Sequence, residues 1–495
     1  MSGIIDFGAY VPRYRLQRQA VVAANAWFNS GLKAHAKGER SMAGWDEDVV
    51  TMALEAARDC LDEGDRTRVS RIILASTSLP FVDRQNFVIV KEALNLTDSV
   101  GGLDVTGSQR AGTSALLDAL YADGKAGGTL CLASEKRRAQ PGSELELLAG
   151  DAAAGFLVGD ADPVATFVAG HSVSVDFVDH FRSSGQAYDY NWEPRWVRDE
   201  GYGKIVPAAV AAALGKAGLS AGQVDSFIMG APIKGVNEAA AKACGIRPEA
   251  VADSLGAVLG DAGCAQPLVV LAHVLETAKP DQTLVVVGFG QGCDVIILRT
   301  TAALSRRRGG LGVSGWLARR KPEANYLKFL FLNGELNLDR GMRAEFDQKT
   351  VQSALYRERK AVLGLVGGRC TKTGAVQFPK SEVSVAQNDW VVGSQEDYPL
   401  ADRTARILTH TADSLAYNPD PPGRYGAVEF DGGGRMTVDF ADLDAEDVVV
   451  GASVRMMFRI KALDELRGFT KYFWKAVPDY KAAATAVHAN AAERN

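Results

Sequence analysis

Residues 104–117, DVTGSQRAGTSALL, have the pattern of a strand that ends in a small-residue turn and continues as a helix. The run Ala111–Ser114 is small enough for the start of this helix to press against a sheet. The first backbone N–H groups of a helix have no partner within the helix, so they can bind a carbonyl oxygen or an anion. A side chain carried on such a turn is projected at the edge of the sheet, where it can take part in chemistry.

This segment resembles the nucleophile turn of the thiolase superfamily, especially that of 3-hydroxy-3-methylglutaryl-CoA synthase and ketoacyl synthase III. Those families have an Asp, then a Cys, then a Gly-Thr pair before the helix. Here Asp104 and Gly112-Thr113 are present, but Gln109 stands at the cysteine position. The resemblance also implies a catalytic His before a Pro and a catalytic Asn further along. The matching positions hold Gly230, or Ala231 in the neighbouring register, and Asp261.

Gln109 excludes the covalent route that the resemblance implies, because an amide nitrogen is not nucleophilic and forms no acyl-enzyme. Its NH₂ group can still donate hydrogen bonds, and beside helix N–H groups it would stabilise an enolate or a thioester oxyanion. Asp261 is the remaining ionisable group at the implied site. A carboxyl group in a dry pocket titrates higher than in water, which suits acid–base work. The alternative is that Asp261 only caps the following helix.

Further residues are candidates by their position. Cys264 begins the helix of the second half, and a catalytic role would make the chain an ordinary acyltransferase. Asp83 is the single carboxylate of the loop in which the related synthases carry a catalytic Glu, and its alternative is an exposed loop residue. The predicted substrate-binding residues are Ser108, Gly230, Lys234, Gly290 and Arg307. The basic runs around Arg307 would bind CoA phosphates or form a solvated face.

The composition is that of a globular protein without nucleic-acid or membrane partners. The 495 residues are 47% hydrophobic and 23% charged, and the net charge of −5 gives no basic surface for nucleic acid. No apolar run reaches membrane-spanning length, and the N-terminus lacks a secretory signal pattern. The six cysteines form no CxxC pair. We therefore expect a reduced, cytoplasmic protein.

An internal repeat predicts the fold of the first 300 residues. The segments DSFIMGAP, AGCAQPLVVLAHVL and TLVVVG repeat the earlier RIILAST, AGTSALLDAL and TLCLAS in the same order. Alternating strands and helices indicate two βα halves, at about 1–165 and 166–300. With the resemblance, this implies a duplicated thiolase-like αβαβα sandwich within an α/β fold. Residues 301–355 are predicted to be a basic, partly helical connector.

Residues 356–480 resemble the DUF35 family, which combines a rubredoxin-like zinc finger with a small all-β OB-fold domain. GGRCTKTGAVQFPKSEVSVAQND has the outline of the finger, but only Cys370 remains among its ligands. Thr373, Ser384 and Gln387 stand at or near the other three positions. One thiolate cannot hold zinc tetrahedrally, so we predict no metal site. The alternating strands after residue 400 are typical of the OB-fold, and residues 481–495 are predicted to be a flexible tail.

Together these features predict an acyl-CoA-dependent enzyme that makes or breaks a carbon–carbon bond without a covalent Cys nucleophile. Retro-aldol cleavage, retro-Claisen cleavage and decarboxylation all fit, with a coenzyme A thioester as substrate or ligand and no tightly bound cofactor. The alternative is a catalytically silent acyl-CoA-binding or scaffold protein that partners an active, paralogous thiolase-like enzyme. The resemblance also implies a homodimer.

Overall fold

The computed structural model describes residues 2–122, 127–307, 310–344, 349, 351–386 and 390–480. The chain divides into two compact units. The first consists of residues 1–44, 48–88 and 98–336, and the second of residues 45–47, 89–97 and 337–495. Among the described residues, none of the helices has both the length and the apolar character needed to cross a bilayer.

The first unit is built on one nine-stranded mixed sheet with the order β11-β12-β13-β8-β1-β7-β6-β4-β5. Its strands are β1 (Gly3–Tyr10), β4 (Val69–Ala75), β5 (Gly101–Val105), β6 (Gly128–Lys136), β7 (Asp151–Gly159), β8 (Ala165–Ser174), β11 (Ser226–Met229), β12 (Thr283–Phe289) and β13 (Gly292–Thr300). The two halves of this sheet meet at β1 and β8, which pair only at Gly3–Thr166 and Ile4–Ala165. Both halves repeat a parallel pair followed by an antiparallel hairpin, β4-β6-β7 in one and β11-β12-β13 in the other.

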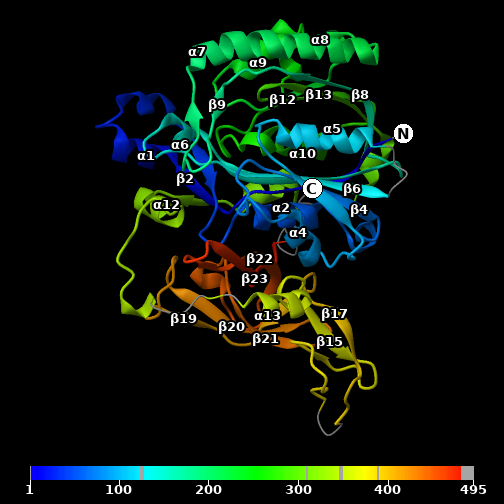
Figure 1. Ribbon diagram of the computed structural model, residues 1–495, viewed down its shortest axis with the longest axis vertical. Helices are drawn as coiled ribbons and strands as arrows, with labels where there is room; N and C mark the ends of the chain where they lie inside the picture. The colour runs from blue at the N-terminus through cyan, green and yellow to red at the C-terminus, as the bar shows by residue number, and fades with distance from the viewer. Residues whose placement is uncertain are drawn as a thin grey trace, which may run out of the picture. The chain divides into compact units, whose positions relative to one another are not determined.

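The helices of this unit are short, and two of them lie between the halves of the sheet. They are α1 (Arg18–Asn25), α2 (Val49–Cys60), α3 (Glu63–Arg66), α4 (Phe87–Ala93, which continues into the second unit), α5 (Ala111–Tyr121), α6 (Glu144–Leu148), α7 (Pro194–Trp196), α8 (Val206–Ala217), α9 (Val236–Ala243), α10 (Gln266–Thr277), α11 (Gly312–Ala318) and α12 (Tyr326–Leu332). The helices α5 and α10 touch each other and contact strands of both halves. Helix α2 covers β1, β7 and β6, and α8 covers β8 and β13 (Figure 1). This is the layered α/β arrangement that the repeat predicts.

The central strands are buried on both faces because helices cover each side. All residues of β7 and β12 are buried, as are nearly all of β6. Their near-continuous apolar sequences are what such coverage requires. At the start of α2, Asp48 accepts hydrogen bonds from the backbone N–H groups of Val50 and Thr51 and completes a capping box with Thr51. That contact fixes where this covering helix begins.

Two small sheets complete the first unit. Strands β14 (Lys321–Glu323), β2 (Tyr14–Gln17) and β3 (Glu39–Met42) form one of them. The other is a hairpin of β9 (His180–Phe181) and β10 (Tyr190–Asn191). The predicted connector 301–355 therefore contains α11, α12 and a strand that pairs with β2. Its status as a separate segment stays a prediction.

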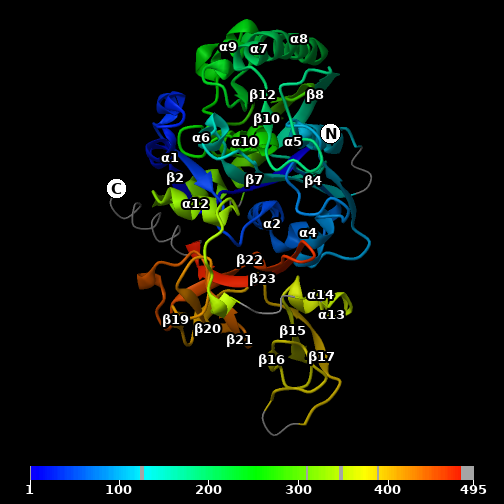
Figure 2. The ribbon, with the colours of Figure 1, turned by 60° about the vertical axis from the view of Figure 1, so that its left-hand side comes forward.

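The second unit contains an all-β sheet in the order β19-β20-β18-β22-β23, to which β21 is added through β20. Its strands are β18 (Ala405–Ile407), β19 (Thr411–Asp413), β20 (Gly423–Phe430), β21 (Arg435–Asp439), β22 (Ser453–Asp464) and β23 (Phe469–Pro478). The helices α13 (Gln352–Arg357) and α14 (Arg359–Val362) precede these strands in the chain. Figure 2 shows the strands in orange and red.

A separate three-stranded sheet occupies the region of the predicted finger. It consists of β15 (Val366–Cys370), β16 (Val376–Gln377) and β17 (Gln395–Pro399) in the order β16-β15-β17. The thiol of Cys370 is buried and lies 3.1 Å from the hydroxyl of Ser394, whereas Thr373 is exposed. Gln387 and the tail 481–495 lie outside the described residues. In the described ranges no group of three or more His, Cys, Asp or Glu could hold a metal, and the absence of zinc stays a prediction.

Candidate active site

The turn between β5 and α5 carries Gln109. Its Nε2 donates to Oγ1 of Thr77, which follows β4, over 3.4 Å. Its Oε1 is buried, and within the described part of the chain no donor reaches it. The loops after β4, β5 and β6 meet here because parallel strands bring their carboxyl ends to one edge of a sheet.

Glu135, near the end of β6, organises the loop that holds Thr77. Its Oε2 accepts hydrogen bonds from the backbone N–H (2.9 Å) and the hydroxyl (2.8 Å) of Thr77, and its Oε1 accepts from Ser78. Glu135 is completely buried. A buried carboxylate is tolerated when donors surround it, and Glu135 thereby fixes the hydroxyl that Gln109 contacts.

Asp261 and Cys264 approach the same place from the start of α10. The Oδ1 atom of Asp261 accepts a hydrogen bond from the N–H of Gly263 over 2.6 Å. A Cβ added to Gly263 would lie 2.5 Å from Oε1 of Gln109 and 3.1 Å from Cγ of Glu135. The structure therefore brings three predicted residues together. We call Thr77, Gln109, Glu135, Arg137, Asp261 and Cys264 the polar cluster.

Burial dominates the electrostatics of the polar cluster. It raises the pKa of the Asp261 carboxyl above its usual range, although the Arg137 guanidinium and the Gly263 N–H act in the opposite direction. Burial, the charge of Glu135 and a hydrogen bond to Glu135 raise the pKa of the Cys264 thiol well above its usual value. Cys264 is therefore a thiol, and the raised pKa makes Asp261 a better proton donor than an ordinary carboxyl group.

Arg137 joins the polar cluster to the hairpin β9–β10. Its Nη2 lies 3.3 Å from Oδ2 of Asp189, and the second Asp189 oxygen accepts from Nη1 of Arg182 over 2.5 Å. Arg182 also donates to the carbonyl of Thr77. Burial lowers the pKa of Arg137, but the carboxylates of Asp189, Asp261 and Glu135 outweigh burial and raise it.

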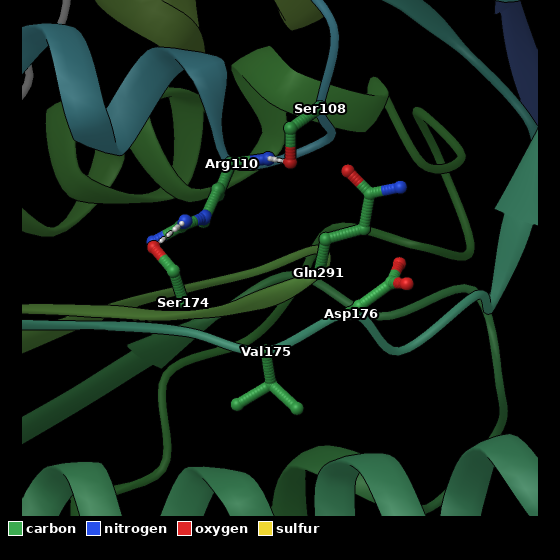
Figure 3. Close-up of a pocket in the computed structure, with 6 residues that line it drawn as sticks. All are labelled: Ser108, Arg110, Ser174, Val175, Asp176 and Gln291. Carbon is green, nitrogen blue, oxygen red and sulfur yellow. Dashed lines mark hydrogen bonds between the residues drawn. The ribbon is translucent and has the colours of Figure 1, made fainter.

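A cavity of about 350 Å³ opens beside Gln109. It is lined by the two neighbours of Gln109 in the turn, Ser108 and Arg110, together with Ser174, Val175, Asp176 and Gln291 (Figure 3). Arg110 lies 2.9 Å from Oδ1 of Asp294 and donates to Ser174 over 2.8 Å, so its charge is compensated. Five of these six lining residues have polar or charged side chains, and the cavity is large enough for a small acyl group.

Two sequence profiles match the chain. One, described as 3-oxoacyl-[acyl-carrier-protein (ACP)] synthase III C terminal, matches residues 214–298. The other, described as ChsH2, C-terminal OB-fold domain, matches residues 398–459. The hydroxymethylglutaryl-CoA synthase of Aeropyrum pernix is 29% identical over 343 residues, which cover 68% of this chain and 95% of the relative.

Solved structures show the same fold at lower identity. An HMG-CoA synthase complexed with CoA is 18% identical, with a TM-score of 0.60 over 71% of this chain and 95% of the other. MvaS in complex with 3-hydroxy-3-methylglutaryl coenzyme A is also 18% identical, with a TM-score of 0.56 over 67% of this chain and 91% of the other.

The resemblance to the thiolase superfamily is confirmed. The predicted thiolase-like α/β fold followed by an OB-fold domain is confirmed as well. The relatives are synthases, in agreement with the prediction of an enzyme.

Gly230 stands at the expected position of the catalytic His, and the structure shows which side chain occupies the space beside it. A Cβ on Gly230 would lie 2.6 Å from Cγ of Gln266. The Gln266 amide accepts from the N–H of Ala262 over 2.8 Å and donates to the carbonyl of Ser254 over 2.5 Å. Gln266 therefore fills the space beside Gly230 and holds the segment that carries Asp261.

Ser108 and Gly290, both predicted to bind substrate, lie against each other. The hydroxyl of Ser108 donates to the carbonyl of Gly290 over 2.9 Å. A Cβ on Gly290 would lie 3.1 Å from the backbone nitrogen of Gln109. This close approach orders the turn, and Ser108 also lines the cavity.

The structure does not bring Asp83, Lys234 or Arg307 into the polar cluster. Asp83 and Lys234 are exposed side chains. Arg307 contacts Asp6 and the carbonyl of Phe7, and its guanidinium lies 3.7 Å from the centre of the Phe7 ring. These contacts engage the Arg307 guanidinium with β1. Arg307 therefore has a structural role there, and the predicted binding of CoA phosphates is not supported.

Sequence reasoning missed Glu135, Arg137 and the hairpin residue Asp189. A signal for the first two was present, since EKRR directly follows the buried strand TLCLAS. Charged residues at the carboxyl end of such a strand face the edge where the loops meet. Asp189 had no comparable signal because it lies in a short hairpin outside the repeat.

Proposed function

We propose that this chain is an acyl-CoA-dependent enzyme that makes or breaks a carbon–carbon bond without forming a thioester on the protein. The supporting observation is the amide of Gln109, which extends from the turn before α5 into the polar cluster and donates a long hydrogen bond to Thr77. Its NH₂ group is available to stabilise an enolate or a thioester oxyanion. Asp261 is the acid–base partner in this proposal.

The relatives support a coenzyme A thioester as the ligand. They are named as hydroxymethylglutaryl-CoA synthases, and solved relatives hold CoA or 3-hydroxy-3-methylglutaryl coenzyme A. The raised pKa of Cys264 argues against its use as an acyl-carrying thiolate. Retro-aldol cleavage, retro-Claisen cleavage and decarboxylation all proceed through an enolate, so all three are compatible with the Gln109 amide.

The experiment measures CoA binding by calorimetry and the turnover of 3-hydroxy-3-methylglutaryl-CoA by chromatography. We expect Gln109→Ala to bind CoA normally but to lose turnover by about 100-fold, as for the loss of an oxyanion donor. Cys264→Ala should retain turnover, and mass spectrometry should find no acyl adduct on the protein. Gln352→Ala, which removes an exposed glutamine at the start of α13, is the matched control. An acyl adduct formed during turnover would refute the proposal.

A catalytically silent acyl-CoA-binding protein that partners an active paralogue is the second candidate. The contact between Gly230 and Gln266 favours it, because the space beside the expected His position is filled by an amide that is already hydrogen-bonded. This candidate requires CoA binding by the wild-type chain with no turnover of any acyl-CoA, even when Gln109 is intact.

We also propose a homodimer. Its support is the position of β5 at the end of the nine-stranded sheet, where one edge has no neighbouring strand within the described chain. An unpaired edge strand is a template for pairing with a second chain. Light scattering of the purified protein distinguishes a mass near twice that of the 52.7 kDa chain from that of a monomer.

A further inference from the structure

The hairpin β9–β10 carries a histidine–carboxylate pair toward the polar cluster. Nδ1 of His180 lies 2.8 Å from Oδ2 of Asp179. The second Asp179 oxygen, Oδ1, is buried, and no donor reaches it among the residues that the structure describes. A carboxylate on one ring nitrogen fixes the orientation of an imidazole and leaves the other nitrogen, Nε2, for proton transfer.

The direction of His180 follows from the alternation of side chains along a strand. Arg182, which directly follows β9, contacts Thr77 and Asp189 on the side of the polar cluster. His180 lies near enough to Asp261 for its charge to act on the pKa of that carboxyl group. Phe181 points the other way and is 46% exposed beside Tyr190, whereas the His180 side chain is 16% exposed. His180 therefore belongs to the inner face of the hairpin.

Several contacts hold this hairpin in place. Asp189 bridges Arg137 and Arg182, and its backbone N–H donates to the carbonyl of Arg138 over 3.0 Å. The backbone N–H of Trp192 donates to the carbonyl of Asp179 over 2.9 Å and closes the hairpin at its base. The chain that enters the hairpin includes Ser174, Val175 and Asp176, which line the cavity beside Gln109.

We propose that His180, oriented by Asp179, is the proton-transfer residue of this site, and that the substrate is a 3-hydroxyacyl-CoA. The inference rests on the proposed function, assigns its proton transfer to His180 in place of Asp261, and specifies its substrate class. An imidazole oriented by a carboxylate is suited to remove the proton of a substrate hydroxyl group. Decarboxylation requires no such base, so the His180–Asp179 pair favours retro-aldol cleavage.

The step balances without an added reactant. His180 Nε2 removes the proton of the 3-hydroxyl group, the C2–C3 bond breaks, and C3 becomes a carbonyl carbon. The bonding pair moves to the thioester enolate, whose oxygen accepts a hydrogen bond from the Gln109 amide. The imidazolium then returns its proton to C2, which gives a shorter acyl-CoA and an aldehyde or ketone.

The last proton transfer is testable in reverse with acetyl-CoA in D₂O. We expect the wild-type chain to exchange the methyl protons of acetyl-CoA for deuterium, as measured by NMR. His180→Gln should bind CoA with an unchanged dissociation constant but exchange at least about 100-fold more slowly, and Asp179→Asn should show a smaller loss. His273→Gln removes another carboxylate-paired histidine, 3.3 Å from Glu276 on α10, and should exchange like the wild type.

The outcomes separate the two proposals. If the wild-type chain does not bind CoA, the proposed function fails. If it binds CoA but does not exchange the methyl protons, or if His180→Gln binds and exchanges at the wild-type rate, the role of His180 is refuted. Thermal unfolding of each variant shows whether a loss of exchange reflects a loss of folding instead of the missing imidazole.

Discussion

Gly263 lies so close to Gln109 that a Cβ on Gly263 would be 2.5 Å from Oε1 of the amide. The same glycine donates its backbone N–H to Asp261. One residue without a side chain thus lets the amide from the first half and the carboxyl group from the second half share a small volume. The duplicated fold makes this meeting possible because α5 and α10 touch each other between the two halves of the sheet.

Gly263→Ala should displace the Gln109 amide and lower turnover by at least about tenfold, since small misplacements at a reacting centre cost this much or more. Gly263 has a φ of 52°, so alanine also costs about 1 kcal/mol of stability. Gly235→Ala is the matched control, because Gly235 has a φ of 77° with no atom near its added Cβ. Equal loss of turnover in both variants would show that only backbone strain matters.

The free energy of unfolding of Asp261→Asn should increase relative to that of the wild type as the pH rises. The folded-state pKa of Asp261 is raised by burial, so its contribution to stability is fully present below the unfolded value of about 4 and is lost as the pH rises through the folded value. Asn avoids this loss and still accepts from the N–H of Gly263. Urea unfolding of both proteins, from below pH ~4 upward through the folded-state pKa, measures the difference in their free energies of unfolding.

The same variant tests the chemical role of Asp261. If the carboxyl group moves a proton, turnover falls by about 100-fold. If Asp261 only caps the first turn before α10, turnover stays at the wild-type level while stability still changes. The comparison decides between the two roles that the sequence left open.

The sequence sufficed for the fold because the repeat and the apolar strands are local patterns. The sequence also indicated Gln109, Asp261 and Cys264 as site residues, since each lies next to a strand or helix of the repeat. It did not indicate Glu135 and Arg137, because their partners lie in other loops. Arg307 was predicted to bind phosphate because of its basic neighbours, but the structure places it against β1. The contact of Arg307 with Asp6 joins residues 301 positions apart and leaves no local signal.

The degenerate finger should not bind zinc. Cys370 is buried beside Ser394, and the described residues contain no group of three or more possible ligands. Protein incubated with excess zinc and then desalted should contain less than one equivalent by elemental analysis, and a chelator should leave the melting temperature unchanged. One tightly held equivalent, lost together with stability on chelation, would contradict this prediction.

Asp189→Ala should destabilise the hairpin β9–β10 by about 3 kcal/mol, because it leaves the buried Arg137 and the largely buried Arg182 without their shared carboxylate. Hydrogen exchange of residues 180–191 should accelerate in the variant. Asp162→Ala breaks the exposed pair between Asp162 and Arg306 and should cost no more than about 1 kcal/mol. If the hairpin amides of Asp189→Ala exchange as slowly as those of the wild type, other contacts hold the hairpin, and His180 needs no ionic bridge to reach the site.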